Sequence, residues 1–301
     1  KVQATRLGGI AIVSYMVMHL GYQFYMGVYL PLVEEVLMIV TCVAYVAVGV
    51  YEDLSGLLSA RLRFVVMLGV GLITMLMAPG LAPEPVGILW VVLIVNASPV
   101  VAAMCTAFCV AFIPNACNTA DGANGLVAGV SACALTGLTT VAPTSLVPFL
   151  LAGLVGCLVF LVFNLVSGRF FLGDGGAYFL GALCGLSLVV VANNSSVSAW
   201  WLVSLVFYPV ADLMWSMGRR IMQGVSPFKP DNQHFHNLLF AYLDSAGRSS
   251  MQANTMTGVL IALIFSGAPL ALTLTGSWQL ESDFWTLWVL SQWAAYALGW
   301  K

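Results

Sequence analysis

Charged side chains are scarce in this chain of 301 residues, where Asp, Glu, Lys and Arg together make up only 7%. Soluble globular domains contain roughly 25% charged residues, so an ordinary soluble domain is excluded. Hydrophobic residues account for 61% of the chain, and its mean hydropathy is +0.98. These values are typical of an integral membrane protein. The apolar runs are about twenty residues long without two-residue alternation, which favours transmembrane helices over barrel strands.

The chain also lacks the cysteine spacing of a disulfide framework or a zinc site. Its seven cysteines lie mostly inside apolar runs and no C-x-x-C occurs, so we interpret them as packing residues. No signal-peptide pattern and no second, soluble domain is recognisable. Because the chain begins at Lys1 rather than at Met, the sequence leaves open a further N-terminal segment with one more helix.

Ten apolar segments are predicted to cross the membrane. They lie at residues 7–27, 33–51, 62–79, 88–113, 123–142, 147–166, 176–192, 198–217, 254–274 and 283–300. We therefore predict an all-α fold, a polytopic bundle of about ten transmembrane helices, or eleven in a longer protein. It forms a single domain over residues 1–301 with a loop at 218–253.

The charge distribution predicts which side each loop faces. Threading the segments through alternate sides places all ten Lys and Arg residues on one face: Lys1, Arg6, Arg61, Arg63, Arg169, Arg219, Arg220, Lys229, Arg248 and Lys301. The opposite face carries acidic residues and no base: Glu34, Glu35, Glu84, Glu281 and Asp283. By the positive-inside rule the basic face is cytoplasmic, and the loop 218–253 lies there.

The most polar stretch, residues 115–125, lies between two apolar runs. Asparagine or aspartate occupies every third position: Asn115, Asn118, Asp121 and Asn124. The Asp-Gly and Asn-Gly pairs predict that the helix breaks at Gly122 and Gly125. Amide and carboxylate oxygens at a broken helix end can hold a hard cation and bind a polar ligand. The alternative is an ordinary loop capped by Asn and Asp.

Three further groups of candidates flank this stretch. Glu52 and Asp53 are adjacent carboxylates, which suit a general base, a metal-facing site or merely an acidic helix end. Arg61 and Arg63 are two residues apart and therefore point to different faces of a helix, so at least one of them could serve only to anchor the chain at the membrane surface. Asp174 lies in a glycine-rich helix start, where it is either a simple cap or a ligand that holds Mg²⁺ against a phosphate.

The loop 218–253 contains Arg219-Arg220, the rigid stretch 226–231 and His234-Phe-His236. Histidines two residues apart diverge on a helix, so both could bind one metal ion only from an extended segment. Neither a cysteine nor a third histidine is nearby, which argues against zinc. The sequence therefore favours a cationic loop that folds over a bound phosphate.

Ordered motifs connect these segments: Arg6-Leu-Gly-Gly9, Glu52-Asp53, Asn115 to Gly125, Asn164 with Phe171-Leu-Gly-Asp174, Tyr208-Pro-x-x-Asp212, Arg219-Arg220, Ser226-Pro-Phe and Asp231-x-x-His234-x-His236. Together they resemble the polyprenyl-phosphate N-acetylhexosamine-1-phosphate transferase family, also called glycosyltransferase family 4. The resemblance is greatest to the bacterial undecaprenyl-phosphate GlcNAc-1-phosphate transferase branch. Three positions depart from the family pattern, which has aspartate at Glu52 and, in most bacterial members, at Asn124, and histidine at Asn237.

The resemblance implies a membrane transferase that moves a sugar 1-phosphate from a UDP-sugar to polyprenyl phosphate, releases UMP and starts cell-surface polysaccharide synthesis, such as that of lipopolysaccharide O-antigen or cell wall. It implies Mg²⁺ as cofactor, with Mn²⁺ as a substitute. The expected partners are a UDP-N-acetylhexosamine, the acceptor lipid and membrane lipid, with a homodimer left open and no nucleic acid. The expected location is the bacterial inner membrane, with the active site facing the cytoplasm.

The resemblance also implies roles for particular residues. Asn118 and Asp174 are the expected metal ligands, with Asp121 in support, and either Glu52 or Asp53 is the base. The expected nucleotide- and phosphate-binding residues are Asn124, Asn164, Phe171, Arg61, Arg63, Asp212, Arg220, His234 and His236.

Three alternatives remain open. One is transfer of phospho-muramoyl-pentapeptide, which differs in the large loop and the sugar contacts. Another is a transporter of anionic or lipid-linked sugars, which predicts ionisable residues at mid-membrane and inverted repeats. The departures from the family pattern motivate a third, a catalytically silent scaffold.

The predicted sidedness can be measured with single cysteines placed at Asn194 and at Ser245 in a background without native cysteines. Because all basic residues fall on one face, we expect only Ser245 to be labelled from the cytoplasm and only Asn194 from the other side. Labelling of both positions from the same side would overturn the assignment of spans.

Overall fold

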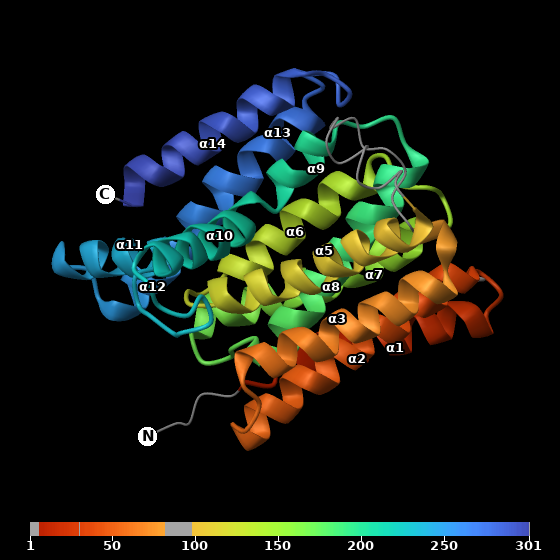
Figure 1. The fold of residues 1–301 in the computed structure, drawn as a ribbon, viewed down its shortest axis with the longest axis horizontal. Coiled ribbons are helices and arrows are strands. Elements are labelled where there is room, and N and C mark those ends of the chain that lie inside the picture. Colours follow the sequence, from red (N-terminus) through yellow and green to blue (C-terminus); the bar gives the residue numbers. More distant parts are fainter. Residues whose placement is uncertain (1–5, 30, 82–97, 301) are drawn as a thin grey trace.

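The computed structural model describes residues 6–29, 31–81 and 98–300, and these form a bundle of helices joined by turns (Figure 1). The helices are α1 (Gly8–Tyr25), α2 (Val33–Ser55), α3 (Ala60–Met77), η1 (Pro79–Leu81), α5 (Pro99–Ala120), α6 (Leu126–Thr139), α7 (Val147–Ser167), α8 (Gly173–Asn194), α9 (Ala199–Leu205), α10 (Phe207–Met222), α11 (Phe235–Ser245), α12 (Ser250–Ala262), η2 (Leu263–Gly267), α13 (Ala268–Leu274) and α14 (Phe284–Trp300). The prediction of an all-α, polytopic membrane bundle is confirmed.

Six helical segments of the described residues are long and apolar enough to cross a membrane, and the number is seven if α9 and α10 form one broken span. The other predicted spans include α6 and α14, which have only 14 and 17 residues, fewer than the about 20 that a full crossing needs. The predicted span 88–113 lies partly outside the described residues, and its described part belongs to α5. The number of ten spans stays a prediction.

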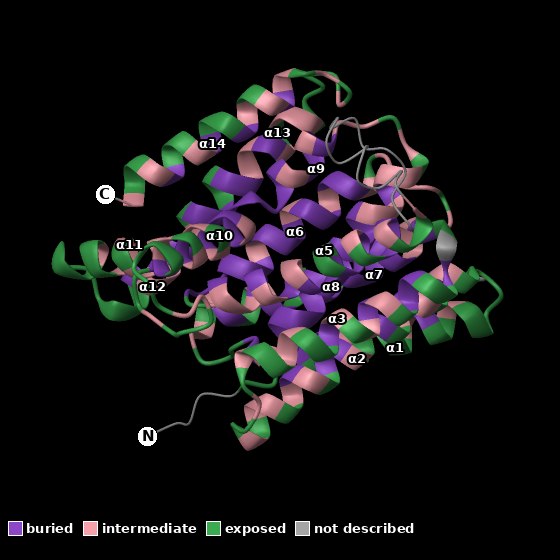
Figure 2. Cartoon of the chain, viewed as in Figure 1, coloured by how far each residue is buried: buried purple, intermediate pink, exposed green. Residues whose placement is uncertain are grey.

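Helix α8 forms the centre of the bundle, and 83% of its best apolar window is buried (Figures 1 and 2). Small residues allow its neighbours to approach closely. A Cβ atom added to Gly9 of α1 would collide with the backbone of Gly176, and one added to Gly49 of α2 would collide with that of Gly175. Small residues at helix contacts permit this backbone-to-backbone packing in membranes. The N-terminus of α8 is therefore held directly between α1 and α2.

The predicted span 198–217 corresponds to two helices, α9 and α10, which meet at a bend of 85°. The break follows from Pro209, which has no N–H to donate to the carbonyl of Leu205 and so prevents α9 from continuing. Helix α10 consequently turns away from the direction of α9. This bend carries Asp212 and Arg220 towards the polar end of the bundle.

The loop predicted at 218–253 is largely helical. Helix α10 extends to Met222, α11 follows, and α12 begins at Ser250 after a capping box formed by Ser249 and Gln252. The irregular part is the segment 223–234, called the arm below. Figure 1 shows that the arm, the α2–α3 connection, the α5–α6 turn and the α7–α8 connection gather at the same end of the bundle.

The close contact of α2 with α8 predicts a strong effect of Gly49→Ala. The added methyl group must push the two backbones apart, a form of overpacking that typically costs ~1–3 kcal/mol, so we expect a lower thermal midpoint in detergent. Gly69→Ala is the matched control, because a Cβ atom at Gly69 of α3 meets nothing within 4 Å. Equal thermal midpoints for the two variants would contradict the tight α2–α8 contact.

Candidate active site

A cavity of about 460 Å³ lies at the polar end of the bundle. We call it the acidic cavity, and its lining residues are Arg6, Asp53, Asn118, Asp121, Phe171, Gly173 and Asp174. They come from the ends of α2, α5 and α8 and from the segments beside them. The structure thus brings together one member of the predicted acidic pair, the polar stretch 115–125 and the glycine-rich start of α8.

The adjacent carboxylates Glu52 and Asp53 point in different directions, since consecutive residues of a helix are about 100° apart. Glu52 accepts a hydrogen bond of 2.7 Å from a backbone N–H in the α2–α3 turn and lies 3.9 Å from Arg63. Asp53 Oδ2 accepts one of 3.2 Å from the backbone N–H of Gly175. Its Oδ1 is buried, 3.8 Å from Arg6, and has no hydrogen-bond partner among the described residues. Asp53 therefore offers an unused carboxylate oxygen.

Asp174 lies in the first turn of α8, as predicted. Its Oδ2 accepts hydrogen bonds from Arg63 and, at 3.3 Å, from the side-chain amide of Asn118. The same amide donates to the hydroxyl of Tyr178 at 3.2 Å. The side chains of Arg63 and Asp174 are only 15% and 25% exposed. Arg63 therefore supplies the positive charge next to Asp174 in the unliganded protein.

Arg61 and Arg63 diverge, as their spacing predicts. Arg61 donates a hydrogen bond of 3.0 Å to the Ser226 hydroxyl and lies 5.4 Å from the centre of the Phe228 ring. Its side chain is exposed to solvent. Arg61 thus ties α3 to the arm, while Arg63 reaches the acidic cavity.

Asp121 directly follows the last residue of α5. Burial, and then the negative charges of Asp174 and Asp53, raise the pKa of Asp121 to about 7, against the opposing effect of Arg6. Uncompensated carboxylates raise each other's proton affinity in this way. The acidic cavity therefore has a surplus of negative charge.

The donor set of the acidic cavity fits Mg²⁺, which prefers carboxylate and amide oxygens. Asp53, Asn118, Asp121 and Asp174 supply such oxygens, and the unpaired Oδ1 of Asp53 has no protein donor of its own in the described part of the chain. No three acidic, histidine or cysteine side chains among the described residues stand close enough to hold an ion together. The chemistry of these residues therefore fits Mg²⁺. The positive charge of Arg63 balances the negative charge of Asp174.

The turn 121–125 is fastened from two sides. Asn164 Oδ1 accepts a hydrogen bond of 2.6 Å from the backbone N–H of Gly125, and its amide donates one of 2.7 Å to the carbonyl of Phe170. Asn254 of α12 accepts one of 2.7 Å from the backbone N–H of Asn124. Asn164 thus uses both ends of its amide group to position the turn, and its predicted contact with the nucleotide stays a prediction.

Asn124 and Phe171, the expected uracil contacts, line one small cavity of about 80 Å³. Asp121 and Phe171 border both this cavity and the acidic cavity. We call the smaller one the turn cavity. The expected nucleotide contacts and the carboxylates therefore adjoin each other.

A larger cavity of about 510 Å³ lies between α3, α5 and α10. We call it the aromatic cavity, and its lining residues are Ala60, Phe64, Phe108, Phe112, Asn115, Thr119, Gly122, Leu213, Met217, Arg220, Pro227, Phe228, Lys229, Pro230, Asp231, His234, His236 and Asn237. The rings of Phe64, Phe108 and Phe112 follow one another with centres 5.9 and 5.6 Å apart. The arm and α11 add cations and histidines at its other end.

His234 and His236 stack with their ring centres 5.5 Å apart and nearly parallel. His236 lies in the first turn of α11, and His234, the N-cap of this helix, has an extended backbone. This single extended residue is enough to align the two rings. His236 also packs against Gly122, where a Cβ atom would collide with the imidazole.

Each histidine has a buried partner on α10. His234 Nδ1 lies 2.6 Å from Asp212 Oδ2, and His236 Nδ1 lies 3.0 Å from the hydroxyl of Tyr208. Burial lowers the pKa of His236 to about 4, so this histidine is neutral at pH 7. At the aromatic cavity, His234 Nε2 lies 3.5 Å from Arg220 and 3.7 Å from Asp231, and His236 Nε2 lies against Gly122.

Arg220 is buried, with 6% of its surface exposed. It donates hydrogen bonds to Asp231 at 2.8 Å and to the Pro227 carbonyl at 2.6 Å, and lies 3.5 Å from His234. Burial acts to raise the pKa of Asp231. Hydrogen bonds from Arg220 and Arg219 outweigh this effect and hold that pKa at about 2. These contacts fasten the arm to α10.

Three residues at the site were not identified from the sequence: Tyr178, Asn254 and Tyr296. Arg6 belonged to a predicted motif, but no role was predicted for it. Tyr178 follows Asp174 by one helical turn, a spacing that could have indicated it. Asn254 and Tyr296 contact the site from helices far along the chain, so nothing in the local sequence indicates them.

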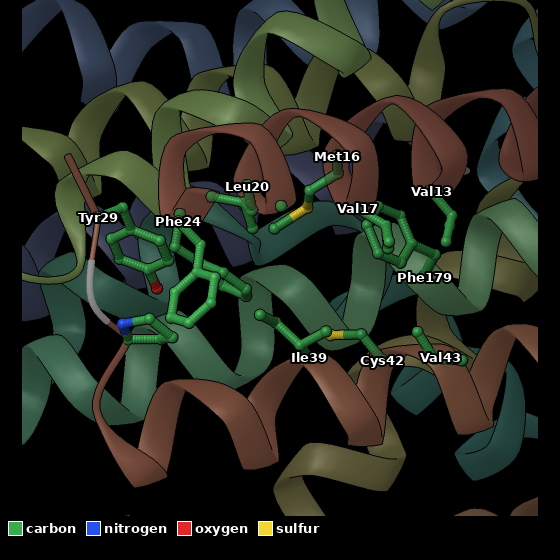
Figure 3. Close-up of a pocket in the computed structure, with 13 residues that line it drawn as sticks. Val13, Met16, Val17, Leu20, Phe24, Tyr29, Ile39, Cys42, Val43 and Phe179 are labelled. Atoms are coloured by element: carbon green, nitrogen blue, oxygen red, sulfur yellow. The ribbon is translucent and has the colours of Figure 1, made fainter. Parts of the chain in front are cut away.

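A further cavity of about 200 Å³ lies between α1 and α2 (Figure 3). Its walls are apolar, with Met16 and Leu20 from one helix, Ile39 and Cys42 from the other, and Phe179 of α8. No charged side chain of the described residues lines it. It therefore offers no catalytic chemistry.

The motifs of the acidic cavity occur in a known family. The model of the family described as Glycosyl transferase family 4 matches residues 36–192, a little over half of the chain. This chain belongs to glycosyl transferase family 4. The matched region contains Asp53, the turn 121–125 and Asp174. The arm, with His234, and His236 of α11 lie beyond it.

Three relatives of this glycosyl transferase family 4 chain have informative names. The undecaprenyl-phosphate alpha-N-acetylglucosaminyl 1-phosphate transferase of Escherichia coli (strain K12) is 31% identical over 179 residues, which cover 55% of this chain and 47% of the relative. The Salmonella typhi protein of the same name is 30% identical over 172 residues, 53% and 45% of the two chains. The decaprenyl-phosphate N-acetylglucosaminephosphotransferase of Mycobacterium leprae is 30% identical over 154 residues, 42% and 38%. The chain spans about half the length of the curated relatives it matches, or less.

The raised pKa of Asp121 predicts a pH-dependent stability that an Asp121→Asn variant lacks. A carboxyl group whose pKa is higher in the folded state stabilises that state at low pH and loses this contribution as the pH rises from 3.8 to about 7. In metal-free buffer, the thermal midpoint of the variant relative to that of the wild type should rise from pH 5 to pH 7. Above about pH 7 this difference should stay constant. A difference independent of pH would mean that Asp121 ionises normally.

Proposed function

We propose that this chain transfers a sugar 1-phosphate, with N-acetylhexosamine 1-phosphate as the favoured group, from a UDP-sugar to undecaprenyl or another polyprenyl phosphate, and releases UMP. The observation that carries the proposal is the meeting of two unlike cavities at the turn 121–125: Asp121 borders the acidic cavity and Gly122 the aromatic one. This arrangement suits a reaction between a water-soluble anion and a lipid. The names of the relatives support the same reaction.

The donor fits the acidic and turn cavities. Its pyrophosphate would lie at the N-terminus of α8, where the free backbone N–H groups of the glycine-rich turn attract anions. Its uracil would lie between Phe171 and Asn124 in the turn cavity. The amide of Asn124 can both donate and accept hydrogen bonds, as recognition of a uracil edge requires.

The acceptor lipid fits the aromatic cavity. Phe108 is 48% exposed on the outside of the bundle, so the row formed with Phe64 and Phe112 leads from the membrane into the cavity. The polyprenyl tail would lie along these rings. Arg220 and Lys229 would attract the lipid phosphate as it enters, since cations and anions pair strongly where water is excluded. The phosphate would then reach Asp53 past the turn 121–125, where the two cavities meet.

Mg²⁺, with Mn²⁺ as a substitute, would be held by Asp174 and Asn118, with Asp121 in support. When bound, such an ion neutralises the charge that develops on the pyrophosphate. Arg63, which donates a hydrogen bond to Asp174, would contact a phosphate oxygen from the same side. The inner membrane is the proposed location, with both cavities facing the cytoplasm where UDP-sugars are found.

Asp53 is the proposed base, rather than Glu52. An oxygen of the lipid phosphate attacks the phosphorus that bears the sugar, and the bond from that phosphorus to the UMP oxygen breaks. Asp53 takes the remaining proton of the attacking phosphate through its unpaired Oδ1 and holds the phosphate in position. Glu52 instead spends its carboxylate on the α2–α3 turn and on Arg63.

The test is release of UMP by purified protein supplied with polyprenyl phosphate, Mg²⁺ and a panel of UDP-N-acetylhexosamines. We expect UMP with at least one donor and, for Asp174→Asn, a loss of at least ~3 kcal/mol in the transition state, roughly a hundredfold in rate. The amide has the same shape, so the variant should remain folded. Part of the activity should return at high Mg²⁺.

Asp244→Asn is the matched control, because Asp244 is an exposed carboxylate on α11 whose partner is the Ser250 hydroxyl at 3.0 Å. Its activity should equal that of the wild type. Absence of UMP with every donor would refute the proposed reaction and favour a scaffold or transporter. Activity of Asp174→Asn close to wild type at low Mg²⁺ would remove Asp174 from the metal site while leaving the reaction intact.

A further inference from the structure

The last helix, α14, directs three polar side chains towards the part of the chain that carries the histidines. Gln292, Tyr296 and Trp300 are each four residues apart and therefore lie on one face of the helix. Gln292 Nε2 donates a hydrogen bond of 2.7 Å to the carbonyl of Phe265 in η2. Trp300 Nε1 donates one of 3.0 Å to the carbonyl of Gln233 in the arm. One face of α14 thus binds two segments that flank the site.

The middle residue of this face reaches the most buried carboxylate at the site. The Tyr296 hydroxyl donates a hydrogen bond of 2.7 Å to Asp212 Oδ1. Tyr296 is fully buried, and Asp212 is 1% exposed. A buried carboxylate is very costly unless it is paired and hydrogen-bonded. The hydrogen bond from the Tyr296 hydroxyl therefore offsets part of the cost of burying the Asp212 carboxylate.

Asp212 in turn holds the first histidine from two directions. Its Oδ2 lies 2.6 Å from His234 Nδ1, and its Oδ1 accepts a hydrogen bond of 3.0 Å from the backbone N–H of Phe235. Tyr296 and Phe235 thus share one oxygen, which leaves the other oriented towards His234. An imidazole whose Nδ1 is fixed in this way presents Nε2 in a defined direction. That nitrogen lies beside Arg220 at 3.5 Å.

We propose that Tyr296 is a positioning residue: through Asp212 it sets the orientation and the tautomer of His234 at the aromatic cavity, and α14 is thereby a functional part of the site. The effect on turnover rests on the proposed function, because His234 lines the aromatic cavity that is assigned there to the acceptor lipid. The orientation of His234 does not rest on it. The inference concerns a helix outside the region matched by the family model.

The hydroxyl of Tyr296 can be separated from its ring. The ring packs against Tyr208, Trp215 and Phe235, with centres 6.2, 5.9 and 5.5 Å away. Tyr296→Phe keeps these ring contacts and removes only the donor to Asp212. Tyr45→Phe is the matched control, since Tyr45 is equally buried and its hydroxyl donates 2.7 Å to the carbonyl of Met67, away from the arm.

The first experiment reads His234 directly and needs no activity. The chain has only three histidines, so protein labelled with ¹⁵N-histidine in detergent gives few ring signals, which His19→Gln and His234→Gln variants assign. We expect Tyr296→Phe to shift the His234 Nδ1 signal and to leave that of His19 unchanged, while Tyr45→Phe shifts neither. Asp212→Asn should move the same His234 signal, and it serves as the second probe if Tyr296→Phe does not fold.

The second experiment separates positioning from structure by kinetics. Tyr296→Phe should raise the apparent KM for polyprenyl phosphate roughly tenfold, because small misplacements of contact groups are costly, and should keep the KM for the UDP-sugar within about twofold. A merely structural role would reduce kcat through less active protein and leave both KM values unchanged. An unshifted His234 signal, or unchanged KM values, would overturn the inference. An inactive wild type would refute the proposed reaction alone and leave the His234 measurement valid.

Discussion

The contact between the start of α8 and the backbones of α1 and α2 is the constraint on which the candidate site depends. Gly9 of α1 and Gly49 of α2 touch Gly176 and Gly175 of α8 directly. No side chain therefore separates the backbones at these two contacts. At this separation Asp53 can accept a hydrogen bond from the first turn of α8. The carboxylates therefore repel one another across a short distance because helix packing places them there. Arg63 offsets this repulsion, and a bound divalent cation would remove it.

The sequence predicted the features that depend on local chemistry. An Asp-Gly pair followed at once by Asn-Gly favours a turn, so the break after Ala120 was foreseeable. The two-residue spacing of Arg61 and Arg63 already implied their divergence. Features that depend on distant partners were not foreseeable. That Asp53 lies against the backbone of α8, and that Tyr296 contacts the Asp212 carboxylate beside His234, depends on helices far away in the sequence. Pro209, which causes the bend at Val206, was visible in the sequence. The apolar residues on both sides of it nevertheless predicted one continuous span.

The site is assembled from two parts that are held together differently. The acidic cavity is formed by helix ends in close backbone contact. The aromatic cavity is closed by the arm, which is attached through side chains: Arg61 to Ser226 and Phe228, Arg220 to Asp231, and Trp300 to Gln233. Exposed contacts such as that of Arg61 are individually weak. The arm is therefore held by a few side-chain contacts, whereas the helices beside the acidic cavity touch through their backbones.

The burial of α8 has a consequence for the surrounding lipid. Changes in bilayer thickness act on helices that touch acyl chains, which respond by tilting or by deforming the membrane. Since 83% of the apolar window of α8 is covered by other helices, such forces reach Asp174 only through its neighbours. Helix α3, of whose apolar window only 22% is buried, is more open to such forces, whereas Asp174 is held by its contacts with Arg63 and Asn118. The chain is thus built to keep the same geometry in membranes of different acyl-chain length.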